Sequence, residues 1–183
     1  QLFSLHTRHT SYLFRVMETG HLEHLYYGRK IHPAIDGLME QHAFAPGNTN
    51  IYDSEHLQFS LEDACLEMSS FGKGDIREPF VELTLSDGSE TSDFLFEKFE
   101  QGTGKEEFET LPGSYDESGE VEWLGVTLRD KNSGVILELH YYVYEDCDVI
   151  TRSAKLINES GDVVKLNRLM SLQLDLEPSD YVF

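Results

Sequence analysis

The stretch from Val135 to Asn158 limits the possible folds of this chain more than any other. Up to Tyr144, apolar residues recur at every second position, the period of a strand that buries one face. The acidic segment 145–148 interrupts this pattern with residues that form strands poorly, and β-branched residues resume over 149–157. The pattern predicts two long antiparallel strands joined by a tight polar turn.

A third strand is expected after the turn cluster at Asn158–Asp162, because apolar residues alternate again from Val164 to Leu176. We expect this strand to continue the same meander. Shorter alternating segments occur earlier in the chain, at 1–5, 11–17, 21–27, 80–85, 94–99 and 121–128. With nine or ten strands and little helix, the sequence predicts an antiparallel β-sandwich.

One long stretch, from Arg29 to Ser60, has no periodic pattern, since prolines, glycines and asparagines interrupt it repeatedly. A loop of about 30 residues inside a compact domain is unusual, and such loops are more often functional than idle. Its aromatic, amide and charged side chains, and those of 72–79, are of the kinds that recognise sugars or partner proteins. A loop that only packs against its own domain is the alternative. For Arg77 the alternative is a structural ion pair with Asp75 or Glu78.

Charge and composition exclude several classes of partner. The formal net charge is −20, which would repel a nucleic-acid backbone or an anionic membrane surface. No apolar run reaches the roughly 20 residues of a membrane helix. The charge therefore leads us to expect no nucleic-acid or membrane partner. Two cysteines are too few for a disulfide scaffold, so we expect a cytoplasmic protein. The start at Gln1 and the apolar end at Phe183 lead us to expect a piece of a longer chain.

Residue chemistry alone predicts no active site. Histidines spaced three apart, His6 with His9 and His21 with His24, would point to opposite faces of a strand, where exposed or half-buried rings are expected. We therefore predict no metal site and no cofactor. The paired carboxylates fall in turns or exposed runs, where nothing would raise a pKa for acid catalysis. No phosphate-binding loop or nucleophile elbow occurs.

Three segments resemble the bacterial α-galactosidases of glycoside hydrolase family 36. They are Thr10–Ile31, Phe71–Pro79 with the sequence FGKGDIREP, and Asp148–Ala154 with the sequence DVITRSA. The three segments keep the family's order and span nearly the whole chain. The resemblance is therefore more specific than a match to a single motif.

The resemblance implies an all-β fold, an antiparallel β-supersandwich of the galactose-mutarotase-like type, formed by residues 1–183 as the N-terminal domain. In such enzymes a (β/α)8 barrel and a small C-terminal β-domain follow. They are retaining hydrolases of terminal α-1,6-galactosides such as melibiose and raffinose, and two barrel aspartates act without a metal. Because this chain lacks the barrel, we expect it to be inactive alone.

The resemblance also implies partners. Many relatives are tetramers in which the N-terminal domain lends a loop to the active-site mouth of a neighbouring subunit. The loop at 33–59 occupies the corresponding place, so we expect Gln41, Asp53 and His56 to approach a galactoside bound by that neighbour. The expected partners are the chain's own catalytic barrel, further copies in a homo-oligomer, and galactoside oligosaccharides.

Two other functions remain open. A free-standing carbohydrate-binding β-sandwich would use aromatic stacking surfaces, for which Trp123, Tyr142 and Tyr144 are the candidates. A mutarotase-like enzyme would use a histidine and a carboxylate on one sheet face, for which Glu138 and His140 alternate suitably. Aromatic-rich faces more often serve sheet packing.

Overall fold

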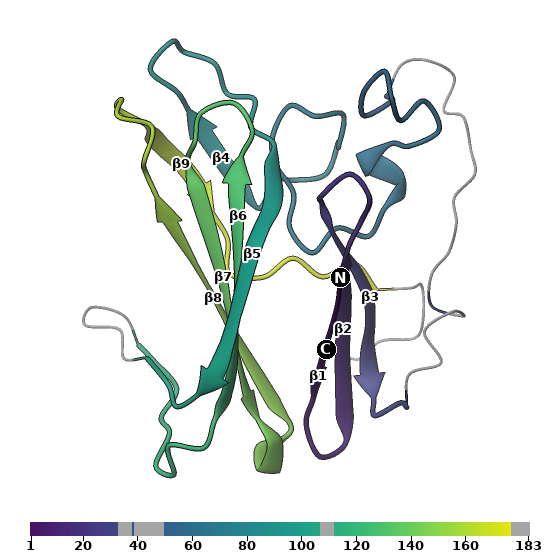
Figure 1. The fold of residues 1–183 in the computed structure, drawn as a ribbon, viewed down its shortest axis with the longest axis vertical. Coiled ribbons are helices and arrows are strands. Elements are labelled where there is room, and N and C mark those ends of the chain that lie inside the picture. The colour runs from purple at the N-terminus through teal and green to yellow at the C-terminus, as the bar shows by residue number, and fades with distance from the viewer. Residues whose placement is uncertain (33–37, 39–49, 107–111, 177–183) are drawn as a thin grey trace.

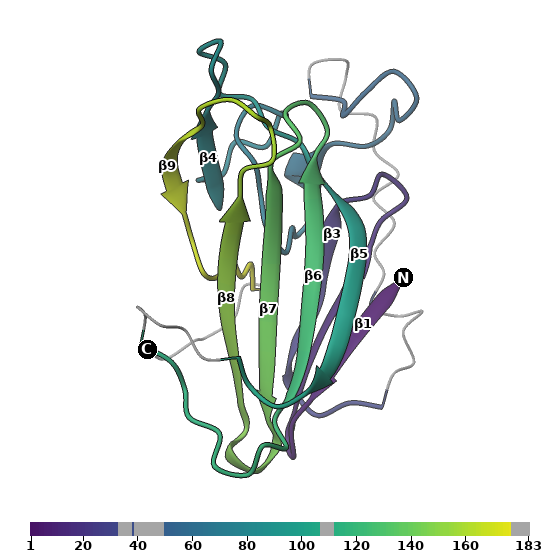
Figure 2. The same ribbon diagram turned by 60° about the vertical axis from the view of Figure 1, so that its left-hand side comes forward.

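Two antiparallel β-sheets face each other in the structure, a computed structural model that describes residues 1–32, 38, 50–106 and 112–176 (Figure 1). One sheet has the order β1 (Leu2–His6), β2 (Thr10–Val16) and β3 (Leu22–Arg29). The other has the order β5 (Phe94–Thr103), β6 (Glu122–Asp130), β7 (Ile136–Tyr144) and β8 (Val149–Ile157). A third pair, β4 (Val81–Thr84) with β9 (Lys165–Leu169), lies beside the upper end of β8 (Figure 2).

Helix is confined in the described ranges to short 3-10 turns such as η2 (Leu61–Asp63) and η3 (Glu145–Cys147). None of the helices in these ranges is long and apolar enough to cross a membrane. The predicted all-β antiparallel fold is confirmed.

The two strands predicted from Val135 to Asn158 form as expected, as β7 and β8. β7 and β8 pair over their full length, from Ile136 opposite Ile157 to Tyr144 opposite Val149. The acidic turn between them ends at Asp148, which adopts the left-handed conformation with φ 54°. Its carboxylate accepts hydrogen bonds from the Thr7 hydroxyl at 2.8 Å and the backbone N–H of His9 at 2.7 Å. The turn of the β7–β8 hairpin is thereby tied to the turn of the β1–β2 hairpin.

The core lies between the two sheets. The predicted inner face of β7, including Leu137, Leu139 and Tyr141, is almost fully buried. Phe14 on β2 stacks on the Tyr141 ring at a centroid distance of 5.1 Å, and Phe3 on β1 stacks on Phe14 at 4.8 Å. Each such buried side chain contributes about 1.5–3 kcal/mol through the removal of apolar surface from water. Alternation along the strands therefore decides which face meets the core.

The prediction for the strand after Asp162 was wrong in its partner and in its length. β9 ends at Leu169 and pairs with β4, with Val81 opposite Leu169, instead of extending the β5–β8 sheet. The reason is that alternation identifies a strand but carries no information on its neighbour. Here β4 buries Val81 and Leu83 completely, and β9 supplies backbone partners for that short strand.

The histidines also differ from the expectation of exposed or half-buried rings. His21 and His24 are both buried, and each lies next to a carboxylate. Nε2 of His21 lies 3.0 Å from Asp93, and Nδ1 of His24 lies 3.3 Å from Glu67. The two rings reach different carboxylates because these residues, three apart on the chain, point to different parts of the interior.

Glu67 is the centre of a polar cluster inside the sandwich. Its fully buried carboxylate accepts hydrogen bonds from the hydroxyls of Tyr12 and Tyr141, both at 2.7 Å to Oε1, and lies 2.8 Å from the guanidinium of Arg152. Burial alone would raise the pKa of Glu67, but the Arg152 charge and the hydrogen bonds from His24 and Tyr12 together hold this pKa below its ordinary value. The carboxylate is therefore ionised in the folded chain at neutral pH.

The free energy of unfolding should depend on the ionisation of Glu67. A carboxyl whose folded pKa lies below its unfolded value stabilises the fold above the unfolded pKa, here 4.5, and that stability is lost as the pH falls through both values. We expect the Glu67→Gln variant to be less stable than the parent at pH 7. The difference should shrink steadily between pH 5 and pH 3, as measured by urea unfolding of both chains. A difference that stays constant over this range would contradict the assignment.

Candidate functional site

The loop over residues 50–60 carries two of the three site residues inferred from the sequence (Figure 1). Asp53 and His56 lie together, with Nδ1 of His56 2.7 Å from Oδ1 of Asp53. The same oxygen accepts the backbone N–H groups of Glu55 and His56, both at 2.9 Å, which forms an Asx-type turn. The hydrogen bond from His56 is the main cause that lowers the pKa of Asp53. Gln41 lies outside the described residues.

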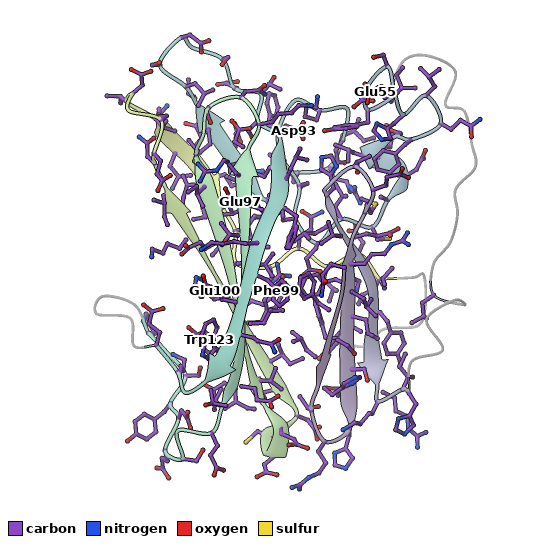
Figure 3. All side chains as sticks on the ribbon, viewed as in Figure 1. Glu55, Asp93, Glu97, Phe99, Glu100 and Trp123 are labelled. Atoms are coloured by element: carbon purple, nitrogen blue, oxygen red, sulfur yellow. The ribbon has the colours of Figure 1, made fainter. Side chains whose placement is uncertain are left out.

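Tyr52 anchors this loop to the sandwich. Its ring is buried, and its hydroxyl donates a hydrogen bond to Oδ2 of Asp93 at 2.9 Å. Its backbone N–H bonds the carbonyl of Phe59 at 2.8 Å, which closes the loop. Figure 3 shows Asp93 at the upper end of β5. The buried contact at Tyr52 therefore holds the neighbouring Asp53 in place.

Asp93 is itself held from several sides. Besides Tyr52, its carboxylate has Nε2 of His21 at 3.0 Å and the ammonium of Lys73 at 3.8 Å. Burial alone would raise the pKa of Asp93, but the His21 contact and the Tyr52 hydrogen bond outweigh burial and lower it. Burial is the main cause that raises the pKa of Tyr52, and the hydrogen bond to Asp93 raises it further. The Tyr52 hydroxyl therefore stays protonated and donates. Sequence reasoning missed Asp93, because nothing in the sequence pairs it with a tyrosine 41 positions away.

A cavity of about 340 Å³ opens beside His56. It lies between the loop and the β2–β3 hairpin, and its lining includes Gln58 and the ion pair of Arg15 with Glu23 at 2.5 Å. The half-buried imidazole of His56 and the exposed amide of Gln58 can hydrogen-bond a polyhydroxylated ligand. The arrangement suits recognition, since it presents donors and acceptors at the rim of a loop.

Arg77 forms structural ion pairs, which was the alternative to a role in recognition. Its guanidinium contacts Asp75 at 2.8 Å and Asp175 at 2.5 Å, and donates to the carbonyl of Leu61 at 2.9 Å. Glu78, the other partner considered, is paired with Arg168 instead. These contacts fix the 72–79 segment against η2 and the segment after β9.

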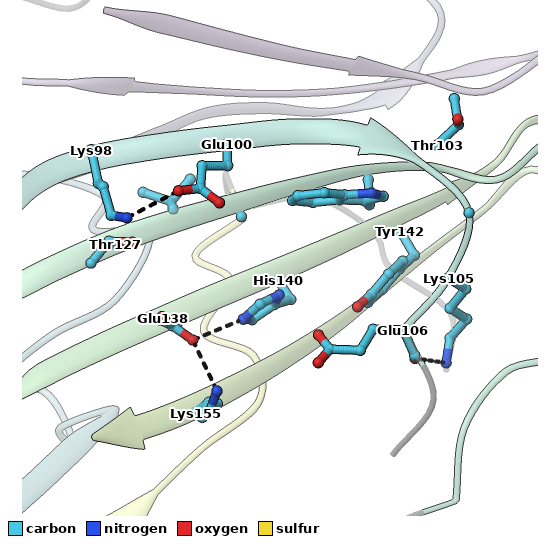
Figure 4. Close-up of a pocket in the computed structure, with 14 residues that line it drawn as sticks. Lys98, Glu100, Thr103, Lys105, Glu106, Thr127, Glu138, His140, Tyr142 and Lys155 are labelled. Carbon is cyan, nitrogen blue, oxygen red and sulfur yellow. Dashed lines mark hydrogen bonds and ion pairs between the residues drawn. The ribbon is translucent and has the colours of Figure 1, made fainter. Parts of the chain in front are cut away.

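The outer face of the β5–β8 sheet forms a second cavity, of about 540 Å³ (Figure 4). Four of the residues named for the alternative functions line it, and they are Trp123, Glu138, His140 and Tyr142. Tyr144 is not among its lining residues, and its hydroxyl bonds that of Ser114 at 2.6 Å. The alternation of β7 predicted this shared face. Sequence reasoning missed Lys98 and Glu100 on β5 and Lys155 on β8, which complete the lining from neighbouring strands.

No group of three or more His, Cys, Asp or Glu side chains within the described ranges is arranged to hold a metal ion. The carboxylate of Asp53 is paired with His56, that of Asp93 with His21, and that of Glu138 with His140 and Lys155.

Known proteins resemble this chain over almost its whole length. The α-galactosidase of Lactobacillus brevis is 35% identical with a TM-score of 0.89, over 96% of this chain and 24% of that one. A variant of α-galactosidase AgaA from Geobacillus stearothermophilus, solved in complex with raffinose, is 30% identical with a TM-score of 0.92, over 99% and 25%. The bifunctional alpha-galactosidase/sucrose kinase AgaSK of Mediterraneibacter gnavus is 30% identical over 99% of this chain and 19% of its own.

The chain thus spans about a fifth to a quarter of the length of these relatives. The family model described as the glycosyl hydrolase family 36 N-terminal domain matches residues 20–183. This match covers most of the sequence, and the sandwich has the same fold as the corresponding part of the solved α-galactosidases. The chain belongs to the glycosyl hydrolase family 36 N-terminal domain family.

Proposed function

We propose that residues 1–183 are the non-catalytic N-terminal domain of a retaining α-galactosidase that hydrolyses terminal α-1,6-galactosides such as melibiose and raffinose. The observation that carries this proposal is the similarity of nearly the whole chain to one part of α-galactosidases, one of them solved with raffinose. The domain would act in assembly and in shaping the active-site mouth, inside a cytoplasmic homo-oligomer.

The chemistry of the described carboxylates supports a non-catalytic role. Retaining glycosidases need two carboxyl groups about 5–5.5 Å apart, one of which is a general acid with a raised pKa. Two of the buried carboxylates, Glu67 and Asp93, have lowered pKa values instead. Glu138, at the outer cavity, is paired with His140 and Lys155. Each of these carboxylates already accepts hydrogen bonds or forms ion pairs with neighbouring side chains. None is therefore arranged as a proton donor to a leaving group.

The loop with Asp53 and His56 would be the contribution of this domain to substrate recognition. Its carboxylate and imidazole are preorganised by their mutual hydrogen bond and by the Tyr52 anchor. Preorganised polar groups lose little conformational freedom when a ligand binds. In the assembled enzyme, Gln41, Asp53 and His56 would contact the aglycone side of a galactoside in the neighbouring subunit.

Activity on p-nitrophenyl α-galactoside tests the proposal directly. The full-length gene product should turn this substrate over, and the purified 1–183 chain should not. Turnover by the 1–183 chain itself would overturn the non-catalytic role. Failure of the full-length protein to act on any α-galactoside would overturn the enzyme assignment.

Asp53→Ala in the full-length enzyme tests the loop. We expect kcat/KM on raffinose to fall about tenfold, which corresponds to the loss of one hydrogen-bonded contact of about 1.4 kcal/mol. Activity on p-nitrophenyl α-galactoside, which lacks the sugar aglycone, should change little. Asp87→Ala is the matched control, because Asp87 also caps a turn, with its carboxylate accepting the N–H of Ser89 at 2.9 Å. Equal kinetics of the Asp53 and Asp87 variants on raffinose would count against the role of Asp53.

A further inference from the structure

The indole of Trp123 lies flat against the outer face of the β5–β8 sheet because two glycines leave room for it. Gly102 stands opposite Trp123 on β5, and a Cβ atom there would lie only 2.9 Å from Nε1 of the indole and 3.1 Å from Cε2. A Cβ atom on Gly125, two positions along β6, would lie 3.4 Å from Cζ3. One face of the ring thus covers glycine backbone. Since Trp123 also lines the 540 Å³ cavity, the opposite face is the one that the cavity exposes.

Polar side chains from β5, β7 and β8 line the same cavity as Trp123, and Figure 4 shows them. Lys98 pairs with Glu100 on β5 at 3.0 Å, whereas Glu138 on β7 lies 3.4 Å from His140 and 3.5 Å from Lys155 on β8. The cavity therefore combines a flat apolar surface with alternating donors and acceptors.

The charges in this cavity decide between ligand classes. Its lining holds three lysines and three glutamates, and Lys98 and Lys155 are both paired with carboxylates. No excess positive charge is present in this lining to attract a phosphate or carboxylate, and the net charge of −20 opposes the approach of an anion. A neutral ligand with many hydroxyl groups matches paired donors and acceptors better than any ion does.

We propose that this cavity is a second carbohydrate-binding site, in which a galactopyranoside stacks on Trp123. The C–H groups on one face of a galactose ring carry partial positive charge, and the face of an aromatic ring is negative. The hydroxyls of the sugar would be bound by Glu138, His140 and Glu100. This proposal goes beyond the proposed function, because the site lies on the outer sheet face, away from the loop of Asp53 and His56. In Figure 3, Trp123 and Glu100 lie on one side of β5 and Glu55 of that loop on the other.

Titration of the full-length protein with methyl β-D-galactopyranoside tests this site by calorimetry. An α-galactosidase does not cleave this probe, and an excess of 1-deoxygalactonojirimycin keeps the probe from competing for the active site. We expect binding to persist in the presence of the inhibitor. In Trp123→Ala the Kd should rise at least about tenfold. In Trp123→Phe, which keeps an aromatic face, the Kd should stay within about threefold of the parent value.

Tyr115→Ala is the control, since it removes an exposed aromatic side chain outside the cavity lining and should leave the Kd unchanged. All three variants should keep the parent's kcat/KM on p-nitrophenyl α-galactoside, and Trp123→Phe and Tyr115→Ala should also keep its thermal unfolding midpoint. Probe binding that is lost with the inhibitor, or that is as tight in Trp123→Ala as in the parent, would overturn the proposal. Because hydrolysis is measured separately, an inactive full-length protein with Trp123-dependent binding would overturn only the proposed function.

Discussion

Replacement of Arg152 by leucine should lower the free energy of unfolding of the chain by about 3–5 kcal/mol. Arg152 is almost fully buried, and its guanidinium neutralises Glu67 at 2.8 Å and stacks over the Tyr141 ring at 4.9 Å. Leucine would leave the Glu67 carboxylate as a charge inside the sandwich with no counter-charge as close. The substitution is costly because a buried charge is left unpaired in a low-dielectric interior. The loss of a favourable contact is not the main cause.

Two further variants separate this explanation from simple loss of packing. The double variant Glu67→Gln with Arg152→Leu should regain part of the stability, because no unpaired charge remains buried and the amide oxygen still accepts from the Tyr12 and Tyr141 hydroxyls. Arg8→Leu should leave the urea midpoint nearly unchanged, since Arg8 pairs with Asp146 at the surface, where ion pairs contribute little. If the double variant is no more stable than Arg152→Leu alone, the unpaired charge is not the cause.

Sequence patterns predicted the strands better than their partners. The 2.0-residue period places β2, β3, β7 and β8 correctly, because burial of alternate side chains is a local property that the sequence displays. The pairing of β9 with β4 depends on which distant edge has unsatisfied backbone groups, and no local pattern records this. For the same reason, the structure was needed to bring Asp93 next to Tyr52 and Glu67 next to Arg152.

The candidate sites also divide into residues that the sequence indicated and residues that only the structure brings together. Asp53 and His56 came from the resemblance to a family, and the structure brings them into contact. Alternation along β7 identified Glu138 and His140 as sharing one face, but a cavity also needs residues from three other strands, in a register that turns and bulges determine. The importance of Gly102 and Gly125 appears only when the Trp123 ring is seen lying over them. A glycine inside a strand signals a close approach but does not say of what.

Asp93→Ala should release the 50–60 loop from the sandwich. The substitution leaves the buried Tyr52 hydroxyl and the His21 ring without their acceptor, at a cost of about 1–3 kcal/mol for each unsatisfied donor. We expect a lower free energy of unfolding by urea. We also expect faster cleavage by chymotrypsin after Leu57, an exposed residue of the loop, under conditions where the rest of the chain stays folded.

The closest comparison is Tyr52→Phe, which removes one donor and keeps the aromatic ring that packs on His21 at 4.8 Å. Its loss of stability should be smaller than that of Asp93→Ala, because the His21 contact with Asp93 remains. If the loop were held by the ring alone, both variants would keep the parent's rate of cleavage after Leu57. A rate that rises with each hydrogen bond removed would instead establish Asp93 as the residue that positions Asp53 and His56.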